Sequence, residues 1–243
     1  MKIPKSHPRH ESLRTRESIA RGVEKGITSI HGLIAHGRGE AFDYLMGEKT
    51  HDFAKKSAEA AAATLLAAKH PVISVNGNTA ALVPKELAEL SNIIHAPIEI
   101  NIFHSSKKRE INIKNYLEKH GAKNALLPDK KYKVMHLESN RKYVNRDGIL
   151  KSDIVFVPLE DGDRTEALIK NNKKVITIDL NPLSRTSQKA TVSITDNITR
   201  AIPLLINTIR QFKKYNKKRL NKIIKNYNNK KTLDEAIKKI RKL

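Results

Sequence analysis

The sequence contains no cysteine and no tryptophan, and aromatic residues make up only 5% of its 243 residues. The lack of cysteine excludes disulfide bonds, thiolate zinc sites and a cysteine nucleophile. There is no Walker A sequence and no G-x-G-x-x-G segment after a predicted strand, so neither a P-loop enzyme nor a standard dinucleotide-binding fold is indicated. The ten histidines include no HExxH pair, and the sequence assigns no metal ligands.

Long hydrophobic runs are also missing. No stretch reaches the roughly 18 consecutive apolar residues of a transmembrane helix, and residues 1–9 do not resemble a signal peptide. We therefore expect a soluble, cytoplasmic protein.

Charge is abundant but unevenly distributed. Lys and Arg number 47 against 25 Asp and Glu, which gives a net charge of +22. More than half of this excess lies in the last 34 residues, which hold 14 basic and 2 acidic residues. The composition predicts a body over residues 1–213 and a basic, Lys/Asn-rich helical extension over residues 214–243.

The extension has a weak helical pattern. Four of its apolar residues share one helical face: Leu220, Ile223, Ile224 and Tyr227. Residues 226–231 break the pattern, and Thr232 with Glu235 predicts a capping box before a second helix. A helical hairpin or a partner-seeking segment is expected, and a solvated, partly frayed arm is the alternative.

In the body, apolar runs typical of strands alternate with helical patterns from residue 71 onward. Strands are expected at 71–75, 97–103, 123–127, 153–157, 173–179 and 190–194. Helices are expected at 11–25, 53–69, 84–95, 107–120, 163–171 and 196–213, with an irregular polar segment up to about residue 150. Helical crossovers between strands predict an α/β fold with a mostly parallel sheet and helices on both faces.

One predicted strand ends in an acid and continues into a polar, basic turn. The apolar run 175–178 is followed by Asp179-Leu180-Asn181, and Arg185-Thr186 comes soon after. Open α/β sheets bind ligands beyond the carboxyl ends of their strands, where an acid accepts from ribose hydroxyls and loop groups hold phosphates. The alternative is an ordinary strand followed by a polar turn.

Two more strands end in polar groups that suit the same crevice. Asn76 and Asn78 follow strand 71–75, where they either contact a ligand or cap the next helix. Residues 160–165 follow strand 153–157 and place acids beside Arg164. These carboxylates suit Mg²⁺ that travels with phosphates and Arg164 suits an oxyanion, or the acids merely favour a helix start.

His36-Gly37-Arg38-Gly39 predicts a glycine-flanked basic turn that opens a short helix. The glycines would let backbone N–H groups approach an anion, and Arg38 would supply a planar fork for phosphate or carboxylate. A tight turn with a solvated arginine is the alternative.

Together these segments resemble the archaeal 4-phosphopantoate–β-alanine ligase family, also called phosphopantothenate synthetase, of coenzyme A biosynthesis. The resemblance covers about residues 3–210 and leaves out the basic extension. Its segments are Ile3 to Arg9, Gly32 to Leu45, Pro71 to Asn78, Pro158 to Ala167 and Ile178 to Thr186.

The resemblance implies a homodimeric enzyme with a Rossmann-like three-layer fold, N-terminal helices and a C-terminal helical extension. It would join 4-phosphopantoate to β-alanine and convert ATP to AMP and diphosphate with Mg²⁺. An acyl adenylate would form first, and the amine of β-alanine would then displace AMP. Positioning and charge stabilisation would supply most of the rate enhancement.

The resemblance also implies roles for individual residues. ATP would be held by Arg16, Arg38, Asp179, Leu180, Asn181, Arg185, Thr186, Asn197 and Ile198. The residues expected to bind 4-phosphopantoate are His36, Asn76, Asn78, Arg141 and Arg164, and those expected to take part in catalysis are Arg38, His36, Asp161 and Asp163.

Two other classes of function were weighed. A nucleic-acid-binding protein would explain the charge, but the charge is concentrated in the extension and no RNP, KH or helix-turn-helix signature occurs. A non-enzymatic nucleotide-binding module would explain the Asp179 turn. It would not explain why the acidic loop and Arg38 occur together.

Overall fold

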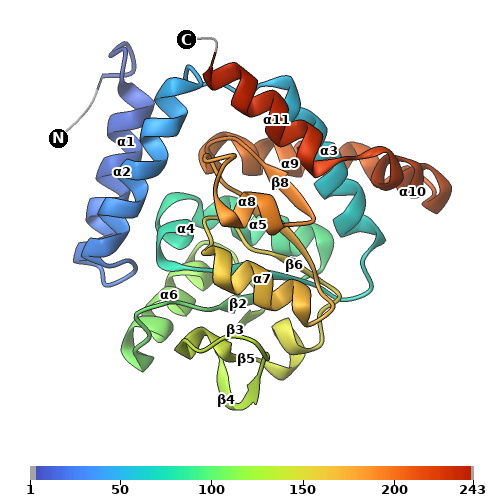
Figure 1. Ribbon diagram of the computed structural model, residues 1–243. Helices are drawn as coiled ribbons and strands as arrows, with labels where there is room; N and C mark the ends of the chain where they lie inside the picture. Colours follow the sequence, from blue (N-terminus) through green and yellow to red (C-terminus); the bar gives the residue numbers. More distant parts are fainter. Residues whose placement is uncertain (1–3, 242–243) are drawn as a thin grey trace.

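Six short strands form one sheet in which every neighbouring pair is parallel. The computed structural model describes residues 4–241, so Ile3 of the first matching segment lies outside it (Figure 1). The strands are β1 (Pro71–Val75), β2 (Ile98–Ile100), β3 (Ala125–Leu126), β6 (Ile154–Phe156), β7 (Lys174–Ile178) and β8 (Val192–Ile194). Their order in the sheet is β3-β2-β1-β6-β7-β8. The chain adds strands outward from β1 on one side and outward from β6 on the other, so the topological switch point lies between β1 and β6, as in doubly wound folds.

Helices cover both faces of the sheet, which confirms the predicted α/β three-layer fold. Alternate strand residues such as Ile73 and Ile176 pack with helices on one face, while Val72, Val155 and Val175 pack on the other. The first face carries α3 (Asp52–Ala67), α5 (Pro84–Ile94) and α9 (Ile198–Phe212), and α6 (Lys107–Lys119) adds Ile113 and Leu117. The second face carries α7 (Gly162–Lys170) and the segment that ends at Ala190 after α8 (Arg185–Lys189).

The N-terminal helices α1 (His10–Glu24) and α2 (Ile30–Leu45) pack against each other and against α4 (Gly77–Leu82). The prediction of a glycine-flanked turn was wrong, because Gly37-Arg38-Gly39 lies inside the continuous helix α2. Contacts on either side hold this segment in the helix, from Asn78 to Gly32 and from Arg200 to Asp43, despite a cost of about 1 kcal/mol per glycine. The backbone N–H groups there are used within the helix, so only the Arg38 side chain remains for an anion.

The segment expected to be irregular contains a small antiparallel hairpin of β4 (Asp129–Lys133) and β5 (Tyr143–Val144). A 3₁₀ turn, η1 (Asn140–Lys142), and a π-helical segment, η2 (Arg146–Leu150), flank β5. Buried Glu99 of β2 fixes this segment by accepting hydrogen bonds from the backbone N–H groups of Asn145 (3.1 Å) and Ile149 (2.7 Å).

The basic extension forms α10 (Lys217–Asn226) and α11 (Asn229–Ile240), which both pack on α3. Leu220 and Ala236 are buried in the main hydrophobic core, so the extension is a pair of packed helices and not a frayed arm. The predicted capping box was wrong, because Asn228 caps α11 and Thr232 lies inside the helix. Asn228 is the N-cap because its short side chain accepts a hydrogen bond from the N–H of Lys231 at 3.0 Å.

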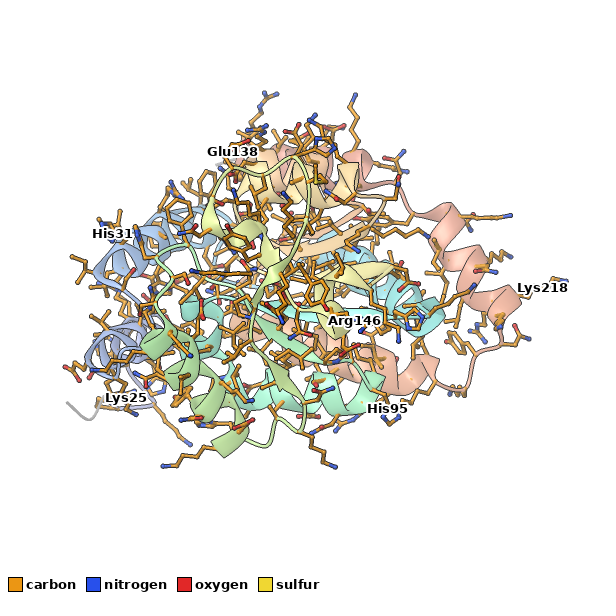
Figure 2. The ribbon with its side chains drawn as sticks, turned by 90° about the horizontal axis from the view of Figure 1, so that it is seen from below. Lys25, His31, His95, Glu138, Arg146 and Lys218 are labelled. Atoms are coloured by element: carbon orange, nitrogen blue, oxygen red, sulfur yellow. The ribbon has the colours of Figure 1, made fainter. Side chains whose placement is uncertain are left out.

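Helix α10 lies far from the start of α2 (Figure 2). Lys218 on α10 and His31 on α2 are at opposite ends of the molecule (Figures 1 and 2). Within residues 4–241, no helix is both long and apolar enough to cross a membrane.

Glu99 makes the stability of the fold depend on pH. Burial raises the pKa of its carboxyl from 4.5 to about 7, against two backbone hydrogen bonds and the charges of Arg164 and Lys173. The folded chain therefore binds this proton more tightly than the unfolded chain. The resulting stabilisation is complete below about pH 4.5 and is lost as the pH rises through about 7.

We predict that Glu99→Gln loses less stability than the parent chain between pH 5 and pH 8, by on the order of 2–3 kcal/mol. Urea unfolding at each pH measures the difference, and Glu118→Gln on the surface of α6 is the control. An identical pH dependence in the Glu99→Gln variant and the parent would contradict this role.

Candidate active site

The turn after β7 is built around the Asp179 carboxylate. It accepts hydrogen bonds from the N–H of Asn181 (2.9 Å) and from the hydroxyl of Ser184. Burial raises the pKa of Asp179, while these bonds and the positive charge of Arg38 oppose the rise. The predicted strand-end acid is therefore present at the sheet edge, and its carboxylate also stabilises its own turn.

Helix α2 passes over this turn. A Cβ atom on Gly39 would lie only 3.6 Å from the Leu180 side chain, and Arg38 is exposed close enough for its charge to act on Asp179. The structure thus brings Arg38 together with the residues after β7. A Cβ atom at position 39 would make ordinary van der Waals contact with Leu180, so α2 packs directly on this turn.

A buried polar network fixes α2 relative to the start of α9. Asp43 of α2 accepts from the Asn197 amide at 2.8 Å and forms an ion pair with Arg200. Arg200 also pairs with Asp196 at 2.7 Å, and Asn197 caps α9. This places Asn197 and Ile198 beside the nucleotide-site candidates. Sequence reasoning missed Asp43 and Arg200, because their pairing joins segments more than 150 positions apart.

Arg16 and His36 meet at one carboxylate between α1 and α2. Glu40 pairs with Arg16 at 2.7 Å and lies 3.8 Å from the Nε2 atom of His36. Burial and the charge of Arg16 lower the pKa of His36, against the opposite effect of Glu40. His36 therefore favours its neutral form, and within residues 4–241 its buried Nε2 has no hydrogen-bond partner.

The two candidates at the start of α8 behave differently. Arg185 is exposed over 59% of its side chain and pairs with Glu166, and its aliphatic stem packs on Gly162. Thr186 is buried and donates to the backbone carbonyl of Glu160 at 2.7 Å. Only the Arg185 side chain is free to reach a ligand, whereas Thr186 ties the β7 side of the crevice to the β6 side.

Arg141 and Arg164 are buried around a single carboxylate. Their side chains are 4% and 1% exposed, and both form ion pairs with fully buried Glu160. Burial alone would raise the pKa of Glu160, but the two guanidinium groups outweigh it and hold that pKa below its ordinary value. Arg164 also donates to Ser74 at 3.0 Å. These contacts, which define the Arg141–Glu160–Arg164 cluster, occupy most of the donors expected to reach substrate.

Asn76 and Asn78 both form hydrogen bonds that hold loops together. Asn76 caps α4 and donates to the carbonyls of Pro158 (3.2 Å) and Leu159 (2.8 Å), which joins the ends of β1 and β6. Asn78 accepts from Thr28 and donates to the Gly32 carbonyl at 2.9 Å. Asn76 and Asn78 follow β1 as expected, and their contacts are those of the alternative, structural interpretation.

The acidic turn after β6 exposes two carboxylates. Asp161 is 58% exposed and pairs with Arg141 at 3.0 Å, and burial followed by the charge of Glu160 raises its pKa. Asp163 is exposed and accepts from the N–H of Arg164. In the described part of the chain, no group of three or more His, Asp or Glu side chains is arranged to hold a metal ion.

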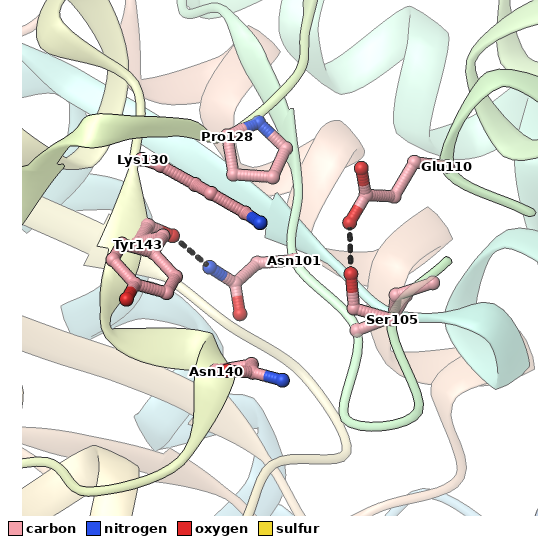
Figure 3. Close-up of a pocket in the computed structure, with 8 residues that line it drawn as sticks. Asn101, Ser105, Glu110, Pro128, Lys130, Asn140 and Tyr143 are labelled. Carbon is pink, nitrogen blue, oxygen red and sulfur yellow. Dashed lines mark hydrogen bonds between the residues drawn. The ribbon is translucent and has the colours of Figure 1, made fainter. Parts of the chain in front are cut away.

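A cavity of about 250 Å³ lies beyond the ends of β2 and β3 (Figure 3). Among its lining residues are Asn101, Ser105, Glu110, Lys130, Asn140 and Tyr143. Sequence reasoning missed it, because the predicted strand 97–103 ran past the true end of β2 at Ile100. Asn101 therefore occupies a strand end, as Asn76 and Asp179 do.

Comparisons with known proteins agree with the resemblance. A family model described as phosphopantothenate/pantothenate synthetase matches residues 53–243, so the basic extension lies inside the family pattern and not outside it as expected. Proteins named 4-phosphopantoate–β-alanine ligase are similar over nearly the whole chain. That of Thermococcus kodakarensis is 50% identical over 98% of this chain and 92% of its own.

Two further relatives with this name support the assignment. That of Thermococcus onnurineus is 51% identical over 99% of this chain and 93% of its own, and that of Methanosarcina mazei is 51% identical over 98% and 94%. Neither alternative, nucleic-acid binding or non-enzymatic nucleotide binding, gains support. The chain belongs to the phosphopantothenate/pantothenate synthetase family.

Proposed function

We propose that this chain is a cytoplasmic ligase of coenzyme A biosynthesis that joins 4-phosphopantoate to β-alanine and converts ATP to AMP and diphosphate. Identity of about half over nearly the full length of the named ligases supports the reaction. The structural observation that carries the proposal is the position of Arg38, exposed on α2 beside the Asp179 turn at the carboxyl end of β7. That edge is where doubly wound sheets bind nucleotides.

MgATP would lie between α2 and the turn after β7. Arg38 and Arg185 present guanidinium groups to its phosphates, and Arg16 reaches the same side through Glu40. The ribose would meet the Asp179-Leu180-Asn181 turn, and the start of α9 at Asn197 and Ile198 would meet the remaining edge of the nucleotide. Asp161 and Asp163 present the hard oxygen atoms that suit Mg²⁺ bound to the diphosphate.

The reaction would run in two steps. A carboxylate oxygen of 4-phosphopantoate attacks the α-phosphorus of ATP, and diphosphate leaves. The amine of β-alanine, after losing one proton, attacks the acyl carbon; the C–N bond forms, AMP leaves, and a second proton leaves the nitrogen. Arg38 would stabilise charge that develops on the phosphates, since pre-positioned cations in a partly desolvated site act without reorganisation.

The remaining candidates would act by positioning. Arg141, Arg164 and Asn76 hold the loops after β2, β6 and β1, and Asn78 fixes the start of α2, so together they shape the place where 4-phosphopantoate would bind. Neutral His36 shares Glu40 with Arg16 and would set the position of that arginine. No direct proton transfer is assigned to His36, because its ring is buried between α1 and α2.

We also propose that the chain forms a homodimer through α2. This helix exposes an apolar stripe that includes Ile30, Ile34 and Tyr44, with Ile34 and Tyr44 about three-quarters exposed. Gly37 lies near the middle of the helix, with open space around its Cβ position. A two-fold axis near Gly37 would let two copies of α2 pack closely and cover the same side chains on both.

The first prediction from the proposed function tests the reaction. The purified chain should exchange labelled diphosphate into ATP when 4-phosphopantoate is present and β-alanine is absent, because the acyl adenylate forms before the amine enters. Formation of ADP and phosphate would contradict adenylation and indicate an acyl phosphate.

The second prediction separates two arginines. Arg38→Ala should lower turnover by roughly 10- to 150-fold, because it removes a charge-assisted contact to developing charge. Arg38→Lys should restore only part of the activity, since lysine lacks the planar fork. Arg185→Ala should instead raise the KM for ATP more than it lowers kcat. Wild-type turnover and ATP dependence in folded Arg38→Ala would remove Arg38 from the site.

The third prediction concerns the dimer. Sedimentation velocity should show a dimer for the parent chain and a monomer for Ile34→Asp, because the charge would be buried at the centre of the stripe. Met135→Asp, an equally apolar exposed position on the hairpin side, is the control and should remain dimeric. A monomeric parent, or an Ile34→Asp variant that stays dimeric, would rule out this interface.

A further inference from the structure

We infer that the cavity beyond β2 and β3 binds β-alanine, with Lys130 holding its carboxylate and Glu110 its ammonium group. The inference rests on the proposed function and assigns the amino-acid substrate to a second part of the crevice, separate from the nucleotide. The observation that supports it is that opposite charges lie on facing walls of one small cavity (Figure 3).

The two walls come from different parts of the chain. Lys130, Asn140 and Tyr143 belong to the hairpin side, built from β4, η1 and β5. Glu110 and Ser105 belong to the opposite side, from the first turn of α6 and the loop before it, and the two side chains are hydrogen-bonded to each other. Figure 3 shows the Lys130 ammonium directed into the space between the walls.

The floor of the cavity is rigid. The Asn101 side chain donates to the carbonyls of Arg141 (3.2 Å) and Tyr143 (3.1 Å) and accepts from Arg141 Nε (3.2 Å). Asn101 therefore has little capacity left for a ligand, and it anchors the hairpin-side wall to the end of β2. The groups available to a ligand are the charged ends of Lys130 and Glu110, with Asn140 projecting from below in Figure 3.

The charge balance of the lining favours a zwitterion. Lys130 and Glu110 sum to no net charge, so each end of β-alanine would meet an opposite charge. The acyl substrate, 4-phosphopantoate, carries a phosphate and a carboxylate, and Glu110 would repel either group. A volume of about 250 Å³ accommodates a small amino acid together with ordered water.

The cavity also lies at the right place for the second step. It adjoins β2, whereas the nucleotide candidates adjoin β7, and β1 and β6 lie between them. Three strand spacings separate β2 from β7, about 14 Å. The α-phosphate end of the nucleotide, the acyl carbon bonded to it and the amine of β-alanine would therefore meet within this interval, at the switch point between β1 and β6, where doubly wound folds place their ligands. Arg141 joins the two regions, because it contacts both Asn101 and Asp161.

Substitution of the two charges tests the inference. Lys130→Met and Glu110→Gln should each raise the KM for β-alanine by about 10- to 100-fold, since each removes one charge-assisted contact. Diphosphate exchange measured without β-alanine should change far less, because that half-reaction does not use the cavity. Lys131→Met on the same strand and Glu118→Gln on the same helix are matched controls, and circular dichroism checks folding.

Analogues that keep one charged end assign the polarity. Inhibition by propionate should weaken in Lys130→Met but not in Glu110→Gln, and inhibition by ethylamine should show the reverse. The opposite pattern, or equal effects in both variants, would overturn the assignment of the two ends.

The outcomes separate this inference from the proposed function. Suppose that the parent chain exchanges diphosphate. If the variants then lose exchange as strongly as they lose ligation, or if the KM for 4-phosphopantoate rises and that for β-alanine does not, the cavity does not bind β-alanine. If the parent shows no exchange, the proposed function fails. β-Alanine binding measured by saturation-transfer NMR then decides the inference, and binding that Lys130→Met leaves unchanged would overturn it.

Discussion

The site depends on one buried carboxylate, that of Glu160, held between Arg141 and Arg164. The cluster joins three strand ends, because Arg164 reaches Ser74 on β1, Arg141 reaches Asn101 after β2, and Glu160 follows β6. Burying three charges is costly, and their mutual attraction offsets the cost only while all partners are present. Loss of one partner would leave an uncompensated buried charge, typically about 3–5 kcal/mol less stable. The crevice therefore keeps its shape as a unit.

Both halves of the crevice are attached to this cluster. On the side of β7, where we propose that the nucleotide binds, Thr186 donates to the Glu160 carbonyl, which ties the start of α8 to β6. On the other side, Arg141 fixes Asn101 at the floor of the cavity. Asp161 is exposed at the edge of the cluster, and Arg38 and Arg185 are exposed on α2 and α8. Some of the polar residues at the strand ends hold the loops in place, so only the others have side chains that can reach a ligand.

The sequence was sufficient to predict elements with strong local patterns. The alternation of apolar runs and helices predicted all six sheet strands, and the predicted acid lies in the turn after β7. The other features could not be predicted, because they depend on contacts between residues that are distant in sequence. Gly37 and Gly39 favour a turn by propensity, but contacts of Gly32 and Asp43 with other segments hold α2 helical. Arg141 and Arg164 look like surface ligands until partners distant in sequence bury them, and the end of β2 depends on its pairing with β1.

We propose that the nucleotide and the amino acid occupy separate halves of one crevice. Hydrogen exchange tests it most directly, with 4-phosphopantoate and α,β-methylene-ATP present so that adenylation is blocked. The nucleotide analogue should protect residues 30–45 and 179–198, and β-alanine added afterwards should protect residues 101–110 and 128–143. Protection of 101–110 and 128–143 by the nucleotide analogue, or none there with β-alanine, would contradict the account.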